Sequence, residues 1–215
     1  MPTPPGGCST RFSLLAYPYE SIGEPVRLAL AQSGVEWVDD RVAGADWPAL
    51  KPTLPNGQLP VMEVDGVVIP QSTAQLRYVG KIGGLYPTDP VQAALADAAI
   101  DTVNDINEPM RASIHEKGEG KKMQLCKDLA ENCIPPWLMN MEKALKAAGG
   151  QYFAGGKLSI GDIAVVARLN WIRSGSLDGI PSTIADGHPL LLSLVDRVMA
   201  EPKIVAYMEA RPKEN

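Results

Sequence analysis

The spacing of apolar and polar positions divides the chain into two parts of different character. Between residues 9 and 84, short apolar runs that suit strands alternate with runs that have helical spacing, whereas only helical patterns follow residue 91. The strands are expected at 12–17, 36–42, 61–64 and 67–69, and the helices at 24–34 and 73–82, with a short helical turn within 46–52. The order is βαβ followed by ββα, and its first unit predicts a parallel strand pair with a right-handed crossover.

A turn signal joins the third and fourth predicted strands. Asp65-Gly66 separates two apolar runs, which indicates a hairpin. Pro60 stands where the third strand begins, so it removes no ladder donor, and its peptide bond could be cis. Ser72 opens a helical pattern whose free N–H groups could bind a carboxylate, while the main chain at Leu59 could pair with an extended peptide. The alternative is a hairpin and a capped helix without a ligand.

Proline, glycine and serine positions divide the second part into helices. Pro109 is expected to kink the first long helix, and Pro135-Pro136 to bend or break the second. Ser159 and Asp162 fit a capping box at the start of a helix that is apolar nearly all round and therefore buried. The linker is expected at 83–90, the long helices at 91–116 and 121–148, and a closing pair at 188–200 and 202–210.

Charge and cysteine content exclude several functions. The 215 residues carry a formal net charge of −5 and are 45% hydrophobic, and an acidic chain is a poor match for nucleic acid. No run of about 18 apolar residues exists, so no membrane span is expected. The first residues lack the pattern of a secretory signal. Three cysteines without a CxxC pair and two isolated histidines favour an intracellular setting and no metal site.

Specific segments resemble the cytosolic glutathione transferases, and within them the sigma class. Residues 45–66, which read ADWPALKPTLPNGQLPVMEVDG, are very similar to the sigma-class segment, and Gln71-Ser72 follows at the family's spacing. The capping box from Ser159 and the closing helix from His188 also fit. The resemblance covers residues 12–212. It implies an α/β thioredoxin-like N-terminal domain (βαβ-ββα, residues 9–84) plus an all-α C-terminal domain (residues 91–215) with a hydrophobic-substrate site.

The resemblance implies that glutathione, as co-substrate, lies along the edge of the N-terminal domain. Leu59 would pair with the cysteinyl main chain, and Pro60 would set that edge. Gln71 and Ser72 would take the γ-glutamyl carboxylate, with Ser72 at a helix start.

The glycyl end of glutathione would be held by Trp47, Lys51 and Gln58, with Lys51 acting by charge pairing. The alternatives are a packing role for Trp47 and a solvated surface charge for Lys51.

An acidic residue of the first long helix reaches the glutamyl amino group across a homodimer interface in this family. Asp105 is the best match and Asp101 the second. Both share one helix face with Asn104, and the alternative is a solvated acidic face. A neighbouring site for a small hydrophobic electrophile would include Met110, Arg111 and Ile114.

The sequence departs from the family's pattern at the group that activates the glutathione thiol. Aligned without a gap, the family's tyrosine position falls on Ala16, and its arginine shortly before the helix falls on Ile22. Tyr17 can take the tyrosine's role only if the strand ends or bulges before it, because a one-residue shift within a strand turns a side chain to the other face. Ser21, Tyr19 or a backbone N–H are the alternatives.

Two hypotheses follow from the resemblance. The first is a cytoplasmic glutathione transferase of detoxification, a homodimer that directs the thiolate at electrophilic carbon, with a glutathione-dependent isomerase as a special case. The second is a binding protein of transferase fold with little turnover, which the residues at positions 16 and 22 favour. A redox enzyme with a cysteine nucleophile is disfavoured, because Cys8 precedes the first strand.

Overall fold

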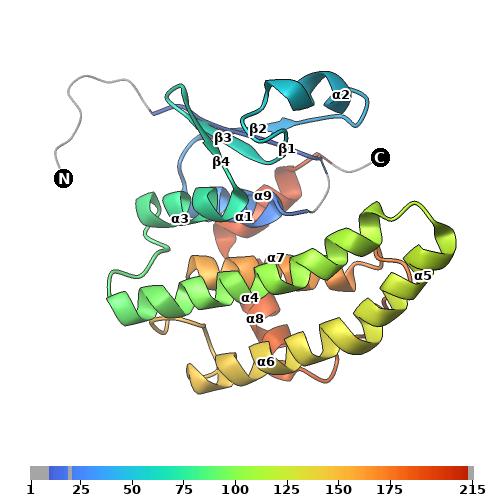
Figure 1. Ribbon diagram of the computed structural model, residues 1–215. Helices are drawn as coiled ribbons and strands as arrows, with labels where there is room; N and C mark the ends of the chain where they lie inside the picture. Colours follow the sequence, from blue (N-terminus) through green and yellow to red (C-terminus); the bar gives the residue numbers. More distant parts are fainter. Residues whose placement is uncertain (1–9, 19–20, 213–215) are drawn as a thin grey trace.

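The computed structural model of the protein describes residues 10–18 and 21–212 (Figure 1). A sheet region comes first and a helical region follows, as the sequence predicts. The elements of the sheet region are β1 (Phe12–Ala16), α1 (Glu24–Ser33), β2 (Trp37–Arg41), α2 (Trp47–Leu50), the 3₁₀ turn η1 (Lys51–Thr53), β3 (Val61–Val64), β4 (Val67–Pro70) and α3 (Ser72–Ile82). Those of the helical region are α4 (Pro90–His115), α5 (Glu119–Asp128), the π-helical segment η2 (Leu129–Cys133), α6 (Ile134–Ala147), α7 (Ile160–Arg173), α8 (Pro189–Met199) and α9 (Pro202–Ala210).

The four strands form one mixed sheet in the order β2-β1-β3-β4. β1 pairs with β2 in parallel and with β3 in antiparallel, and β3 and β4 form the predicted hairpin. Asp65 and Gly66 take φ values of 50° and 84° at its turn, which suits the turn type that joins tightly twisted strands. The Leu59-Pro60 peptide bond is cis.

Alternating burial along β1 decides which face of the sheet the helices cover. Phe12, Leu14 and Ala16 are buried, and the ring of Phe12 lies 6.5 Å from that of Tyr78 in α3. In Figure 1, α1 and α3 lie between the sheet and the helical region, whereas α2 lies on the outer side. The sheet therefore contacts the helical region through α1 and α3.

The helical region is organised around α7, whose residues from Ile160 to Leu169 are all buried. α7 packs against α4, α1 and α8. Gly161 permits the contact with α4, because a Cβ there would lie 2.9 Å from the carbonyl oxygen of Ala96. The predicted capping box is confirmed: Asp162 accepts hydrogen bonds from the N–H and the hydroxyl of Ser159 at 2.8 and 2.7 Å.

Two sequence predictions change in detail, and a third stays a prediction. β1 ends at Ala16, one residue earlier than predicted. α4 includes Pro109 in its interior, where the expected kink stays a prediction. The predicted helix over 121–148 is interrupted as expected, but by the π-helical segment η2, and Pro135-Pro136 lie in the first turn of α6, where proline is tolerated.

Candidate active site

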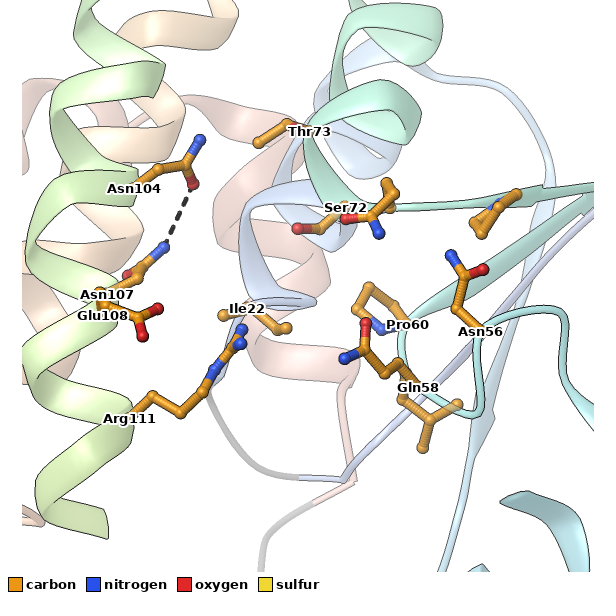
Figure 2. A pocket seen from close by; sticks show the side chains of 13 residues that line it. Ile22, Asn56, Gln58, Pro60, Ser72, Thr73, Asn104, Asn107, Glu108 and Arg111 are labelled. Carbon is orange, nitrogen blue, oxygen red and sulfur yellow. Dashed lines mark hydrogen bonds between the residues drawn. The ribbon is translucent and has the colours of Figure 1, made fainter. Parts of the chain in front are cut away.

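A cavity of about 230 Å³ lies between the sheet region and α4 (Figure 2). One wall comes from the approach to β3 and from the start of α3, and the other from one face of α4. Its lining residues are Ile22, Asn56, Gln58, Leu59, Pro60, Pro70, Gln71, Ser72, Thr73, Asn104, Asn107, Glu108 and Arg111. Five of the residues predicted to bind glutathione, Gln58, Leu59, Pro60, Gln71 and Ser72, are thus brought together in one polar cavity.

The main chain at Leu59 is open toward a ligand. The β1–β3 ladder begins at Val61, so Leu59 lies just beyond it. Within residues 10–18 and 21–212, neither the N–H nor the C=O of Leu59 has a hydrogen-bond partner. The Leu59 side chain is buried, which anchors this segment. An extended peptide can therefore add main-chain hydrogen bonds along this edge.

The start of α3 has the geometry of an anion site. The first hydrogen bond of the helix runs from the N–H of Gln75 to the carbonyl of Gln71 at 3.0 Å. Among the described residues, the N–H groups of Ser72 and Thr73 have no acceptor. Gln71 holds φ at 71° with ψ at 110°, a conformation that costs a non-glycine residue about 1–3 kcal/mol and that is concentrated at functional sites.

Gln75, which is fully buried, joins the two segments of this wall. Its Nε2 donates to the carbonyl of Pro60 at 3.0 Å and to the carbonyl of Ile69 at 2.8 Å. One amide group thus fixes the segment that carries Leu59 relative to the segment that carries Gln71. This role of Gln75 was not among the predictions from the sequence.

The wall from α4 presents Asn104, Asn107, Glu108 and Arg111, which Figure 2 shows facing Gln58, Pro60 and Ser72. Asn107 donates from Nδ2 to Oδ1 of Asn104 at 3.3 Å, and its own buried Oδ1 has no partner among the described residues. The four α4 residues are three or four positions apart, so they form a polar stripe on one face of the helix. This stripe is a signal in the sequence that could have identified Asn107 and Glu108.

A second cavity of about 150 Å³ adjoins the first and shares Ile22, Leu59, Asn107 and Arg111 with it. Its other lining residues are Tyr17, Ser21, Met110, Ile114, His115, Arg168 and Trp171. It therefore includes the three residues predicted for a hydrophobic-substrate site, Met110, Arg111 and Ile114. The two cavities meet where Leu59 and Ile22 line both.

Tyr17 lies at the second cavity, directly after the end of β1. The condition for it to take part is met, because the strand ends at Ala16. Ala16 itself is buried, and a Cβ placed on Gly23 would lie 3.1 Å from its Cβ and 3.7 Å from that of Pro60. The residue at the family's tyrosine position is thus buried near Pro60 and lines neither cavity.

Contacts on both sides fix the position of Tyr17. Its ring packs edge-on against Trp47 with centroids 5.6 Å apart, and its carbonyl accepts from Nη2 of Arg27 at 2.7 Å. The buried Arg27 also donates from Nε to Asp39 at 2.9 Å and pairs with Glu24 at 3.5 Å. Partial burial raises the pKa of the Tyr17 hydroxyl above its usual value, which keeps it protonated and able to donate.

Three predicted glutathione-binding residues line neither cavity. Trp47 is half-buried against Tyr17, Lys51 is exposed beside Gly57, and Asp105 is exposed on α4. Asp101 pairs with Arg77 at 3.3 Å. The role of Asp105 across a subunit interface stays a prediction, as do those of Trp47 and Lys51. Of the alternatives to Tyr17, Ser21 lines the second cavity, and Tyr19 lies outside the described residues.

Two further features concern metals and membranes. In the part of the chain that the structure describes, no group of three or more histidine, cysteine or acidic side chains is arranged to hold a metal ion. No helix in the same part combines the length and the apolar character needed to cross a bilayer.

Comparisons with known proteins agree with this geometry. The family model described as "Glutathione S-transferase, C-terminal domain" matches residues 104–211. Hematopoietic prostaglandin D synthase of Gallus gallus is 37% identical over 88% of this chain and 91% of its own. Glutathione S-transferase 1 of Ascaris suum is 32% identical over 94% of this chain and 98% of its own.

Solved structures give the same result. The structure titled prostaglandin synthase D of Nilaparvata lugens has a TM-score of 0.88 and 34% identity, and covers 95% of this chain and 100% of its own. The glutathione S-transferase from Ascaris lumbricoides has a TM-score of 0.84 at 31% identity, and covers 95% of this chain and 98% of its own.

Proposed function

Because the chain belongs to the glutathione S-transferase family, with sigma-like relatives, we propose that its two adjoining cavities divide one transferase reaction between glutathione and a small hydrophobic electrophile. The enzyme is a glutathione transferase that uses glutathione as co-substrate. The observation that supports this division is the contact between a polar cavity with an open peptide edge and an apolar cavity that has Tyr17 in its wall.

Glutathione would occupy the first cavity as an extended peptide. Leu59 would form main-chain hydrogen bonds with the cysteinyl residue, because its N–H and C=O have no partner among the described residues. The γ-glutamyl carboxylate would accept from the free N–H groups at Ser72 and Thr73, where the helix dipole adds positive potential. Gln58 would reach the glycyl end, with Lys51 as a charged partner nearby.

Glu108 is proposed to pair with the γ-glutamyl ammonium group. It lines the same cavity as Ser72, and its carboxylate has the required charge. Asp105, the residue chosen from the sequence, lines neither cavity of its own chain and would require a second subunit.

The sulfur of glutathione would then point toward the second cavity, since Leu59 lines both cavities. Tyr17 is proposed to donate its hydroxyl hydrogen to the thiolate. A hydrogen bond to a charged group contributes about 1.5–3 kcal/mol, and each pKa unit corresponds to about 1.4 kcal/mol, so this bond would lower the thiol pKa by about 1–2 units. The thiolate would attack an electrophilic carbon held beside Met110 and Ile114.

Ultraviolet thiolate absorbance of bound glutathione against pH tests the role of Tyr17. In Tyr17→Phe the thiol pKa should rise by about 1–2 units. Tyr78→Phe is the matched control, because Tyr78 lines neither cavity. An unchanged pKa in Tyr17→Phe would move the role to Ser21, Tyr19 or a backbone N–H, and a raised thiol pKa in Ser21→Ala would then assign it to Ser21.

The second candidate function is a glutathione- and ligand-binding protein with little turnover. The buried Ala16 at the family's tyrosine position favours it. Bound glutathione that titrates like the free thiol in the unmodified protein would support this function instead.

Three broader properties belong to the same proposal. We infer a homodimer, because Val67 and Val68 on the hairpin and Val91 and Leu95 on α4 expose apolar side chains. Sedimentation velocity tests this, and a monomer at micromolar concentration would contradict it. A cytoplasmic location and a role in detoxification are further parts of the proposal, which cell fractionation and growth under electrophile stress would test.

A further inference from the structure

The second cavity contains a buried positive charge. Arg168 lies on α7, which is otherwise almost entirely apolar, and only 3% of the residue is exposed. Moving a cation out of water is costly unless a hydrogen-bonded partner compensates for it, so buried arginines are normally paired.

Among the described residues, Arg168 has no hydrogen bond and no ion pair with a carboxylate. Its Nε is buried without a partner among the described residues, and its guanidinium lies 4.7 Å from the ring centroid of Trp171. Burial lowers its pKa to about 10, so the group stays charged at neutral pH.

Arg27 shows how this fold treats a buried arginine outside the cavities. Arg27 is also fully buried, yet it is paired with two carboxylates and one carbonyl. Arg168 lacks such partners among the described residues. It lines the second cavity, which is the proposed binding site of the electrophile. The difference indicates that the partner of Arg168 arrives with the substrate.

The rest of the second cavity defines what that substrate is. Met110, Ile114 and Trp171 offer apolar surface, and no acidic side chain is among the described residues that line it. Arg111 also lines it, but this residue is exposed, so its charge is solvated, and the side chain of His115 is exposed as well. A ligand that satisfies this cavity has an apolar body and one anionic group that reaches the buried guanidinium.

We infer that Arg168 determines substrate specificity by binding the carboxylate of an apolar electrophile in the second cavity, an inference that rests on the proposed transferase function. The planar guanidinium can bind a carboxylate through two hydrogen bonds. For a conjugated ketone, the thiolate sulfur of glutathione forms a bond to the β-carbon, the C=C π pair becomes the C=C bond of the enolate, and the carbonyl π pair moves to the oxygen. The proton that the thiol lost returns through water to the α-carbon, which re-forms the ketone. The remote carboxylate is unchanged and serves only to hold the substrate.

The test compares 4-acryloylbenzoate with its methyl ester, two conjugated ketones that differ in one charge. The unmodified enzyme should show a kcat/KM at least tenfold higher for the acid. In Arg168→Met this acid-to-ester ratio should fall to about one, and in Arg168→Lys to an intermediate value, because lysine keeps the charge without the planar fork. The acid-to-ester ratio of kcat/KM is taken within each variant, so a general loss of activity or of folded protein cancels from it.

Arg111→Met is the matched control, because Arg111 lines the same cavity but is exposed. Its ratio should stay near that of the unmodified enzyme. Salt at about 0.5 M, roughly three times the physiological ionic strength, should not abolish the preference, since buried pairs are poorly screened. A preference lost in Arg111→Met but kept in Arg168→Met would overturn the inference, as would a preference of the unmodified enzyme for the ester.

Binding without reaction separates this inference from the proposed function. Calorimetry with 4-propanoylbenzoate, which lacks the reactive double bond, and with its methyl ester should show at least tenfold tighter binding of the acid in the unmodified protein but not in Arg168→Met. If the acid binds in this way without turnover of either ketone or of 1-chloro-2,4-dinitrobenzene, the anion site stands and the transferase function fails. If the neutral electrophiles turn over but acid and ester bind equally, only the Arg168 inference fails.

Discussion

Replacement of Gln75 by leucine is expected to loosen the first cavity, which is proposed to bind glutathione, while leaving the fold intact. The change keeps the volume and the burial of the side chain but removes both donors to Pro60 and Ile69. These two carbonyls hold the segments that carry Leu59 and Gln71 at a fixed separation.

The magnitude follows from the groups that lose or gain partners. Two buried carbonyls lose a hydrogen bond, at about 1–1.5 kcal/mol each. The Oε1 of Gln75 has no partner among the described residues, so its removal returns about 1 kcal/mol. The net loss in the free energy of unfolding is about 1–2 kcal/mol, which lowers the Tm by about 2–8 °C for a chain of this size.

The change in the KM for glutathione tests the positioning role of Gln75 more directly than the change in stability does. We expect the KM for glutathione to rise about tenfold, equal to about 1.4 kcal/mol of binding, with a smaller change in kcat. Steady-state kinetics at saturating electrophile and thermal unfolding by calorimetry measure the two effects.

Gln32→Leu is the matched control for this prediction. Gln32 also has an unpartnered buried Oε1 and donates to Glu201 at 3.1 Å, but it lies between α1 and α9 and lines neither cavity. It should change the Tm without changing the KM. A Gln75→Leu enzyme with the KM of the unmodified enzyme and a lowered Tm would refute the positioning role.

Two further predictions concern charge. Glu108→Gln should raise the KM for glutathione about tenfold, whereas Asp105→Asn should change it less than twofold; a larger effect of Asp105→Asn in steady-state kinetics would instead favour pairing across a subunit interface. Burial raises the pKa of Asp162 to about 6, and three hydrogen bonds limit that rise. Since the folded state then binds more protons than the unfolded state between about pH 4 and pH 6, stability should fall by about 3 kcal/mol as the pH rises through this range. Urea denaturation at several pH values should show this slope in the unmodified protein and not in Asp162→Asn, and equal slopes would contradict it.

Local sequence signals were sufficient for one wall of the candidate site. The hairpin, the helix start at Ser72 and the open edge at Leu59 follow from turn residues, proline positions and apolar runs that act over a few residues. These signals keep their meaning in the folded chain because β3 pairs with β4, its neighbour in the sequence, across the turn at Asp65-Gly66. The same holds for the capping box at Asp162.

The opposite wall depends on information from beyond one local segment. The polar stripe on α4 is visible in the sequence, but the face of α4 that meets the cavity depends on the rotation of that helix against the sheet region, so Asp105 was chosen while Asn107 and Glu108 were not. Arg168 lies within an apolar run, and the sequence alone does not show that its side chain is buried without a partner. The position of Tyr17 depended on where β1 ends, and strand ends are poorly determined by sequence patterns.

The contacts of α9 with the loop after β1 affect the order in which the enzyme becomes complete during synthesis. Arg41 donates to the carbonyl of Pro18 at 2.6 Å and lies 3.4 Å from the hydroxyl of Tyr207, and Arg211 pairs with Glu24 at 3.1 Å. The turn that holds Tyr17 is therefore braced by α9, which is synthesised after the sheet region. At about 5–20 residues per second, α9 is added about 6–25 s after the sheet region has been made. During that interval a nascent chain can fold its sheet, but the turn at Tyr17 lacks its brace, so this part of the candidate site is complete only once α9 has been made.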